Sequence, residues 1–194
     1  MERDKALLPF GAMTFLERAA AAVSSVAIKP IVIVGNLPEK DFSSALIGDY
    51  RFVSDSKFGN DHVAPRGSII GLQTALKNSL KRWSAILACD LPFASGTLFE
   101  RLAMLGTAEC ATVVPVQPDG RWQPLCALYQ NAVCLPVVEK MVSDNVWSLK
   151  ELLSRVSVRR VEFAELADLP NAENFFFNVN TPADYKRALS LKQI

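Results

Sequence analysis

Residues 86–93, with the sequence ILACDLPF, constrain the fold more than any other stretch of the chain. The small and apolar residues at 86–89 are typical of a strand buried on both faces, as in the middle of a parallel sheet. Asp90 then interrupts the apolar run, and Pro92 prevents both a continued strand and an immediate helix. We therefore expect the Asp90 carboxylate at the C-terminal edge of a sheet, where open α/β folds bind ligands.

A single carboxylate at such an edge is suited to Mg²⁺. This ion takes one or two protein carboxylates together with the oxygens of substrate phosphates. An Asp in this position can also simply cap the turn that follows a strand. The spacing alone leaves both interpretations open, so Asp90 is a candidate magnesium ligand.

Composition indicates a single globular domain over residues 1–194. Half of the residues are hydrophobic and 21% are charged, which is enough apolar material for a sizeable core. The net charge of +1 argues against nucleic acid or a membrane surface as a partner. No apolar run approaches the roughly 20 residues that a membrane helix needs.

The four cysteines, Cys89, Cys110, Cys126 and Cys134, are widely spaced and form no CxxC pair. This spacing suggests neither a zinc site nor a redox pair. Because no signal peptide is apparent, we expect free thiols and a cytoplasmic protein. His62 is the only histidine, so a metal site with two histidines is excluded.

Strand and helix patterns alternate through the first 110 residues, which predicts parallel βαβ units in a doubly wound sheet. A helix should begin after Thr14, which forms a capping-box pattern with Glu17. We expect strands at 31–34, 50–55 and 86–89, and helices at 15–26, 41–47, 69–80 and 95–105.

The second half mixes a hairpin with further helices. Strands at 111–116 and 123–129 should pair antiparallel through the turn at 118–121, extending the parallel sheet on one side. We expect helices at 134–142, with Pro136 in the first turn, and at 148–155, an edge strand at 156–163, a strand at 175–180 and a last helix capped by Thr181.

Polar residues recur where the expected strands end, at Asn36, Asp55, Asp90 and Asn180. A glycine-containing helix entrance at 67–71 adds to them. Since these groups should meet at one edge of the sheet, the sequence predicts a site of nucleotide size.

Five motifs stand out along the chain: DKALLPFG at 4–11, GSIIGL at 67–72, ACDLPF at 88–93, QPL at 123–125 and NVNTPAD at 178–184. In their order and spacing they resemble those of MobA-like molybdenum cofactor guanylyltransferases, and this resemblance covers essentially the whole chain. It implies a Rossmann-like three-layer α/β sandwich of the nucleotide-diphospho-sugar transferase type, with a mostly parallel sheet and an antiparallel extension.

The resemblance also implies an activity: transfer of GMP from GTP to molybdenum-bound molybdopterin, with release of pyrophosphate. Mg²⁺ is the implied cofactor. Molybdoenzymes or their chaperones are implied as further partners, and the chain is expected to be a monomer or weak oligomer.

Matching positions give implied roles to four residues. Lys5 would hold the nucleotide phosphates, and Asp90 would hold Mg²⁺ that bridges them. Both are candidate catalytic residues. Asn178 and Asn180 would face the pterin substrate and the reacting phosphate.

Four further positions are implied to contact the nucleoside. Asn36 and Asp55 would lie against it, and a carboxylate can accept hydrogen bonds from guanine N1–H and the amino group. Gly67 and Gly71 would let the backbone approach the base closely.

The sequence departs from the family in one respect, because no strand and Gly-rich loop precede Asp4 and Lys5. Either the recorded start is internal to a longer protein, which we favour, or the chain is an impaired nucleotide-binding relative. Use of CTP or another NTP also stays open. Without a central strand its neighbours should be unpaired and apolar surface exposed, so we expect poor solubility or weak activity.

Overall fold

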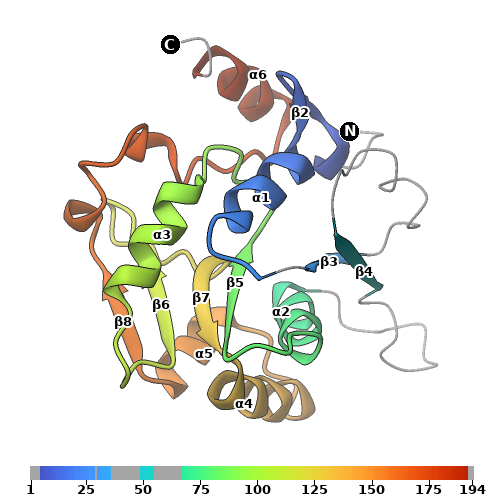
Figure 1. Ribbon diagram of the computed structural model, residues 1–194, viewed down its shortest axis with the longest axis vertical. Coiled ribbons are helices and arrows are strands. Elements are labelled where there is room, and N and C mark those ends of the chain that lie inside the picture. The colour runs from blue at the N-terminus through green and yellow to red at the C-terminus, as the bar shows by residue number, and fades with distance from the viewer. Residues whose placement is uncertain (1–4, 29, 36–48, 55–66, 192–194) are drawn as a thin grey trace.

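The computed structural model describes residues 5–28, 30–35, 49–54 and 67–191 (Figure 1). Several sequence predictions fall elsewhere and lie outside the described residues: the helix at 41–47, His62, Asn36 and Asp55.

The described chain begins with a short 3-10 helix, η1 (Lys5–Leu7), and a tight hairpin of strands β1 (Pro9–Phe10) and β2 (Met13–Thr14). Helix α1 (Phe15–Ser24) follows directly. Its predicted capping box is confirmed. Thr14 Oγ1 accepts a hydrogen bond from the Glu17 N–H at 3.2 Å, and the Glu17 carboxylate accepts one from the Thr14 N–H at 2.5 Å.

Strands β3 (Ile31–Gly35) and β4 (Tyr50–Ser54) confirm the first predicted parallel pair, with Ile31 opposite Tyr50. Ile31 and Ile33 alternate into the core, as the β-branched run indicates. The remaining predicted strands and helices occur mostly within a few residues of their expected positions.

Four strands form the larger sheet in the order β5 (Trp83–Leu87), β7 (Cys126–Gln130), β6 (Thr112–Pro115) and β8 (Val158–Val161). The predicted antiparallel pairing of β6 with β7 is confirmed, and β8 lies at the edge beside β6. Two expectations were wrong. β7 lies inside the sheet rather than extending it, and β5 pairs antiparallel with β7, so parallel pairs do not dominate among the described strands.

Five further helices complete the described fold. Helix α4 begins earlier than predicted, which places Pro136 inside the helix rather than in its first turn. Asn131 anchors this earlier start, since its side chain accepts from Ser84 Oγ and donates to the Lys81 carbonyl. The helices are α2 (Ser68–Lys77), α3 (Gly96–Leu105), α4 (Asn131–Ser143), α5 (Leu149–Arg155) and α6 (Pro182–Leu191).

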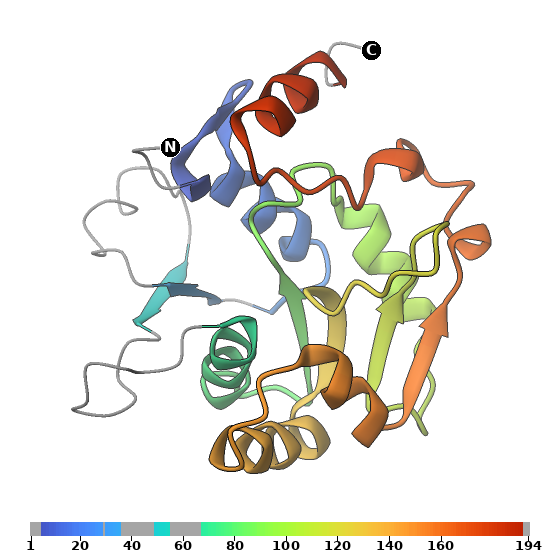
Figure 2. The same ribbon diagram turned by 180° about the vertical axis from the view of Figure 1, so that it is seen from behind.

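The helices cover both faces of the larger sheet. Along β7, Cys126 and Leu128 pack into one core with α1 and α3, whereas Ala127 and Tyr129 pack into another with α2, α4 and α5. This alternation follows from the two-residue period of a strand. Figures 1 and 2 show the two helix layers from opposite sides, and the predicted α/β sandwich is confirmed at this level.

Residues 175–180 do not form the predicted strand. A 3-10 helix at Ala172–Asn174 leads into an irregular segment whose backbone is tied to the loop after β5, because the Val179 N–H donates to the Asp90 carbonyl at 2.9 Å. Phe175 and Val179 are fully buried. The apolar run therefore anchors a loop to the core instead of filling a sheet.

An aromatic cluster joins the two ends of the described chain. The Phe10 ring packs edge to face on Phe15 at 5.5 Å and on Phe93 at 5.4 Å, and the cluster also contains Val179 and Ala188. We call these five residues the ring cluster. It connects the N-terminal hairpin and α1 to the loop after β5 and to α6, which lie side by side in both views (Figures 1 and 2).

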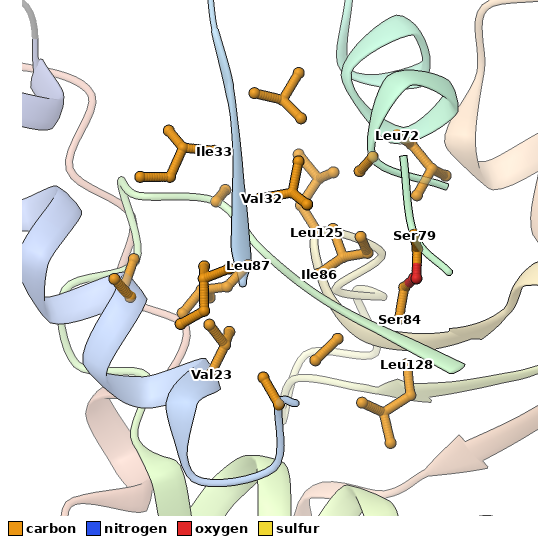
Figure 3. A pocket seen from close by; sticks show the side chains of 18 of the residues that line it. Val23, Val32, Ile33, Leu72, Ser79, Ser84, Ile86, Leu87, Leu125 and Leu128 are labelled. Carbon is orange, nitrogen blue, oxygen red and sulfur yellow. The ribbon is translucent and has the colours of Figure 1, made fainter. Parts of the chain in front are cut away.

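Between the two sheets lies a large cavity, which we call the inter-sheet hollow. Among the described residues, β3 pairs only with β4, and β5 pairs only with β7. A cavity of about 1060 Å³ separates their facing edges, with α1 and α2 on its other sides (Figure 3). Apolar side chains of β3 and β5 line this cavity.

Within the described ranges, no helix combines the length and the apolar character that crossing a membrane requires.

Candidate active site

Asp90 lies at the C-terminal end of β5, as the sequence predicts. The strand gives way to a turn after Leu87, since the Ala88 N–H still donates to the Leu125 carbonyl at 2.8 Å while the Leu91 N–H already folds back onto the Ala88 carbonyl. Pro92 then follows in a loop that is tied to α1, because Arg18 Nε donates to its carbonyl at 2.8 Å. The Asp90 side chain is held half-buried at the rim of the hollow.

Lys5 reaches the same rim from the opposite end of the sequence. Its ammonium group donates to Asn180 Oδ1 at 2.9 Å, and its charge acts on the Asp90 carboxylate. The hairpin fixes this position, because the Leu8 N–H donates to the Lys5 carbonyl and the Phe15 N–H donates to the Leu8 carbonyl, both at 3.1 Å.

Asn178 and Asn180 come from the irregular segment before α6. The Asn178 side chain hydrogen-bonds the Asp90 carboxylate, and Asn180 accepts from Lys5. Both asparagines are exposed, whereas Val179 between them is buried in the ring cluster. The structure thus brings four of the predicted site residues together, which we call the rim cluster: Lys5, Asp90, Asn178 and Asn180.

Asp184, which the sequence left open as a second metal ligand beside Asp90, positions Asn180 in the structure. Its carboxylate accepts hydrogen bonds from the Asn180 N–H at 3.1 Å and the Thr181 N–H at 2.8 Å, and Thr181 Oγ1 accepts from the Asp184 N–H. This is a capping box around the predicted helix start. In the sequence, the three-residue spacing of Thr181 and Asp184 matches this capping-box pattern.

Burial raises the pKa of the Asp90 carboxyl above its ordinary value. Lys5, a backbone hydrogen bond and Asn178 each act in the opposite direction without cancelling the burial. The ionised carboxylate is therefore incompletely compensated by the protein, and a cation or a donor group from a ligand would stabilise it.

The donor set around Asp90 fits Mg²⁺ only if most ligands come from outside the protein. Within the described ranges, no three His, Cys, Asp or Glu side chains gather closely enough to hold a metal ion. Mg²⁺ is commonly held by one or two carboxylates, with water and substrate phosphates completing its six ligands. The single, undercompensated carboxylate of Asp90 fits that arrangement.

Gly67 and Gly71 lie at the start of α2, and Gly71 also lines the hollow. A Cβ built at either position meets no described atom within 4 Å, and neither glycine has a positive φ. The described fold itself therefore does not require glycine there. The open space leaves room for a ligand to approach the backbone.

A second cavity, of about 460 Å³, is lined by Asn178 and Asn180. Its polar side chains come mainly from the turn after β6 and from the segment before α6. The sequence left open a contact of Arg121 and Gln123 with the pterin that the resemblance implies. It did not predict a cavity here, because the cavity forms between segments that are some 50 residues apart. Its lining includes Gln117, Arg121, Gln123, Glu173, Phe176, Asn178 and Asn180.

The cysteines form no disulfide, as predicted. Cys110, Cys126 and Cys134 are buried, and Cys89 is partly buried. Burial raises the pKa of Cys126 to about 12 and that of Cys134 to about 11. Thiols with such values are not nucleophiles at neutral pH.

In this α/β sandwich, a lysine, a carboxylate and two amides meet near the C-terminal end of β5, beside two cavities. This arrangement is typical of the nucleotidyltransferase class. The match to a family model is more specific. Residues 1–160 match the MobA-like NTP transferase domain, and the chain belongs to this family.

Similar proteins support this assignment along nearly the full chain. The chain is 29% identical over 191 residues to the "Probable molybdenum cofactor guanylyltransferase" of Carboxydothermus hydrogenoformans, covering 98% of this chain and 89% of that protein.

Two solved structures share the fold. Molybdopterin-guanine dinucleotide biosynthesis protein A from Archaeoglobus fulgidus has a TM-score of 0.76 at 23% identity, covering 99% of this chain and 92% of that one. The 2-C-methyl-D-erythritol 4-phosphate cytidylyltransferase from Thermus thermophilus has a TM-score of 0.68 at 18% identity, covering 98% of this chain and 94% of that one.

Proposed function

We propose that the chain transfers GMP from GTP to molybdenum-bound molybdopterin, forming the guanine dinucleotide cofactor and pyrophosphate. The observation that carries the proposal is the rim cluster, in which Lys5, Asp90 and two asparagines meet between two cavities. The similarity to a protein named as a molybdenum cofactor guanylyltransferase supports the choice of GTP and of the acceptor.

The nucleotide would place its phosphates beside Lys5. An ammonium group is a compact cation that stabilises negative charge on phosphate oxygens, above all on the leaving pyrophosphate. The open backbone at Gly67 and Gly71 offers a surface for the nucleoside. The roles of Asn36 and Asp55 toward the base remain part of the proposal and lie outside the described residues.

Asp90 would hold Mg²⁺ at the rim. The ion, when bound, neutralises phosphate charge and orients the triphosphate. Asn178 would keep the Asp90 carboxylate oriented through the hydrogen bond that joins the two side chains.

The second cavity would take the acceptor. Its polar lining can bind a heteroaromatic ring system, and Asn178 and Asn180 would direct the acceptor's terminal phosphate toward the nucleotide. An oxygen of that phosphate forms a bond to the α-phosphorus of GTP, and the bond from the α-phosphorus to the bridging oxygen breaks. Positioning and charge stabilisation suffice for this step, without a covalent enzyme intermediate.

A thermal-stability panel with GTP, CTP, ATP and UTP, each with Mg²⁺, tests the nucleotide and the metal. GTP at about 100 times its Kd should add about 2.7 kcal/mol to the free energy of unfolding. Asp90→Asn should weaken this Mg²⁺-dependent binding at least about tenfold, since it removes the only charge that Asp90 offers the ion. Asp144→Asn is the matched control, because Asp144 pairs with Lys140 at the end of α4.

The acceptor is tested separately, by pyrophosphate release from GTP with and without molybdenum-bound molybdopterin. Release that depends on this acceptor supports the proposal. Stabilisation by CTP instead of GTP would reassign the nucleotide, and a panel without any stabilisation would indicate a chain that has lost nucleotide binding.

A further inference from the structure

Arg18 is a half-buried cation on α1. Its Nε–H donates to the Pro92 carbonyl at 2.8 Å, and its guanidinium carbon lies 5.0 Å from the centre of the Phe10 ring. Burial lowers the pKa of Arg18, and none of the ion pairs in the described part of the chain involves it. Because burying a cation costs free energy, its two contacts call for a reason.

The two contacts lead to the two charged residues of the rim cluster. Pro92 lies two residues after Asp90, in the loop that follows β5. Phe10 lies in β1, within the hairpin that holds Lys5. Helix α1 contacts both β2 of this hairpin and β5, and Figure 1 shows it beside both. Arg18 thus ties the loop that carries Asp90 to the hairpin that carries Lys5.

The bond to Pro92 fixes one side of the Asp90 loop. The other side is held by the Val179 N–H, which donates to the Asp90 carbonyl at 2.9 Å. The proline nitrogen carries no hydrogen, so the carbonyl is the backbone group by which Pro92 can be held. Without the Arg18 bond, the loop keeps the Val179 bond but loses this attachment to α1.

The charge of Arg18 has a smaller part at this site than its hydrogen bond. In the described part of the chain, Lys5 is the cation whose charge lowers the pKa of Asp90, and Arg18 is not among the groups that shift it. Arg18 therefore acts on the site through the Nε–H and the Pro92 carbonyl.

We propose that Arg18 is a positioning residue for the rim cluster, because its Nε–H holds the Asp90 loop on α1 where the carboxylate can bind Mg²⁺ beside Lys5. This inference rests on the proposed function and assigns to Arg18 no contact with the substrates. The contact with the Phe10 ring holds the guanidinium group and so fixes the direction of the Nε–H.

Two variants separate the hydrogen bond from the charge. Arg18→Gln places a neutral amide N–H at nearly the same distance along the side chain as Nε, so it can keep the bond to Pro92. Arg18→Lys keeps the positive charge but has a methylene group where arginine has Nε. Arg18→Ala removes both the donor and the charge.

The Mg²⁺ requirement of GTP binding is the functional readout. It is measured as the Mg²⁺ concentration that gives half of the maximal thermal stabilisation at saturating GTP. We expect Arg18→Ala and Arg18→Lys to raise this concentration about tenfold or more, and Arg18→Gln to raise it by less than about threefold. A general loss of stability lowers the melting temperature of a variant but does not produce this order.

Arg101→Ala is the matched control. Arg101 on α3 also donates to a backbone carbonyl, that of Glu165 at 2.6 Å, and it pairs with Asp168. These contacts include no residue of the rim cluster. The variant should therefore lower the free energy of unfolding and leave the Mg²⁺ requirement unchanged.

Hydrogen exchange of the Val179 N–H gives a readout that needs neither nucleotide nor metal. Because this group donates to the Asp90 carbonyl, it should exchange about tenfold faster in Arg18→Ala and Arg18→Lys than in Arg18→Gln. If Arg18→Lys is tolerated better than Arg18→Gln in both measurements, or if Arg18→Ala has no effect, the proposal is wrong. If the unsubstituted chain shows no Mg²⁺-dependent GTP binding, the proposed function fails, and exchange at Val179 still decides whether Arg18 holds the loop.

Discussion

Asp90 is held where its charge is costly to the fold and useful to a ligand. Its carboxylate is half-buried, and Lys5 and Asn178 compensate the burial only in part. Groups with shifted pKa values that lie in clefts are candidates for functional sites. The burial of Asp90 also predicts how the stability of the fold depends on pH.

We expect Asp90→Asn to stabilise the ligand-free protein at neutral pH. The pKa of Asp90 is raised in the folded state, so the folded state binds more protons than the unfolded state between the two pKa values. Stability therefore falls as the pH rises through that window. Asn does not titrate, so the variant does not lose stability in this window. The difference in the free energy of unfolding between the variant and the unsubstituted protein should therefore shrink as the pH falls toward the pKa of the unfolded state. Urea denaturation at several pH values without Mg²⁺ measures it.

Asp144→Asn should show the opposite sign. The hydrogen bond from Lys140 lowers the pKa of Asp144, so its stabilising contribution is present at neutral pH and is lost on acidification. Because this pair is exposed, the effect should be small. A loss of stability in Asp90→Asn at neutral pH would contradict the burial argument.

At the scale of single residues, the sequence predicted the rim cluster well. Asp90 followed from an acid placed between an apolar run and Pro92, and Lys5, Asn178 and Asn180 followed from motif resemblance. The contacts of Asp184 with the backbone N–H groups of Asn180 and Thr181 were not predicted, although the spacing of Thr181 and Asp184 matches a capping box.

Secondary-structure elements were predicted where local chemistry decides them. The capping box at Thr14, the N-cap residue Ser95 and the β-branched run of β3 mark their elements in the sequence. Which strands pair with one another depends on contacts between residues that are far apart in the sequence. β5 has the apolar sequence of a central parallel strand, yet it pairs antiparallel with β7, and the aromatic run after Phe175 packs a loop instead of a strand.

The ring cluster should carry much of the link between the N-terminal hairpin and the rest of the fold. Phe10→Ala is expected to lower the free energy of unfolding by about 3–5 kcal/mol, since Phe10 is fully buried. It should also weaken GTP binding, because β1 holds η1 and therefore Lys5 in place. Chemical denaturation and nucleotide titration measure the two effects.

Met13→Ala in the same hairpin is the control. Met13 is 45% exposed, so its replacement should change the free energy of unfolding by no more than about 0.5 kcal/mol. Similar losses for the two variants would mean that the hairpin, rather than the ring cluster, makes the connection.

On the scale of the whole molecule, the two sheets differ in how well they are supported. The larger sheet has four strands and a helix layer on each face, whereas β3 and β4 form a separate two-stranded sheet in the described part of the chain. The alternation of strand and helix patterns along the chain predicted the layers. The division of the sheet was anticipated only from the family resemblance, since composition does not reveal which strands are neighbours.

Native-state hydrogen exchange should resolve this difference. Two-stranded sheets are marginally stable alone, so N–H groups on β3 and β4 should exchange through local opening. We expect their opening free energy to lie about 2 kcal/mol or more below that of β6 and β7. Equal values for all four strands would show that the protein unfolds as one cooperative unit.

The inter-sheet hollow also bears on cooperativity. Because it separates β3 from β5, no strand-to-strand hydrogen bonds join the two sheets in the described part of the chain. Helix α2 contacts both β3 and β5, so a disturbance of one sheet should reach the other through this helix.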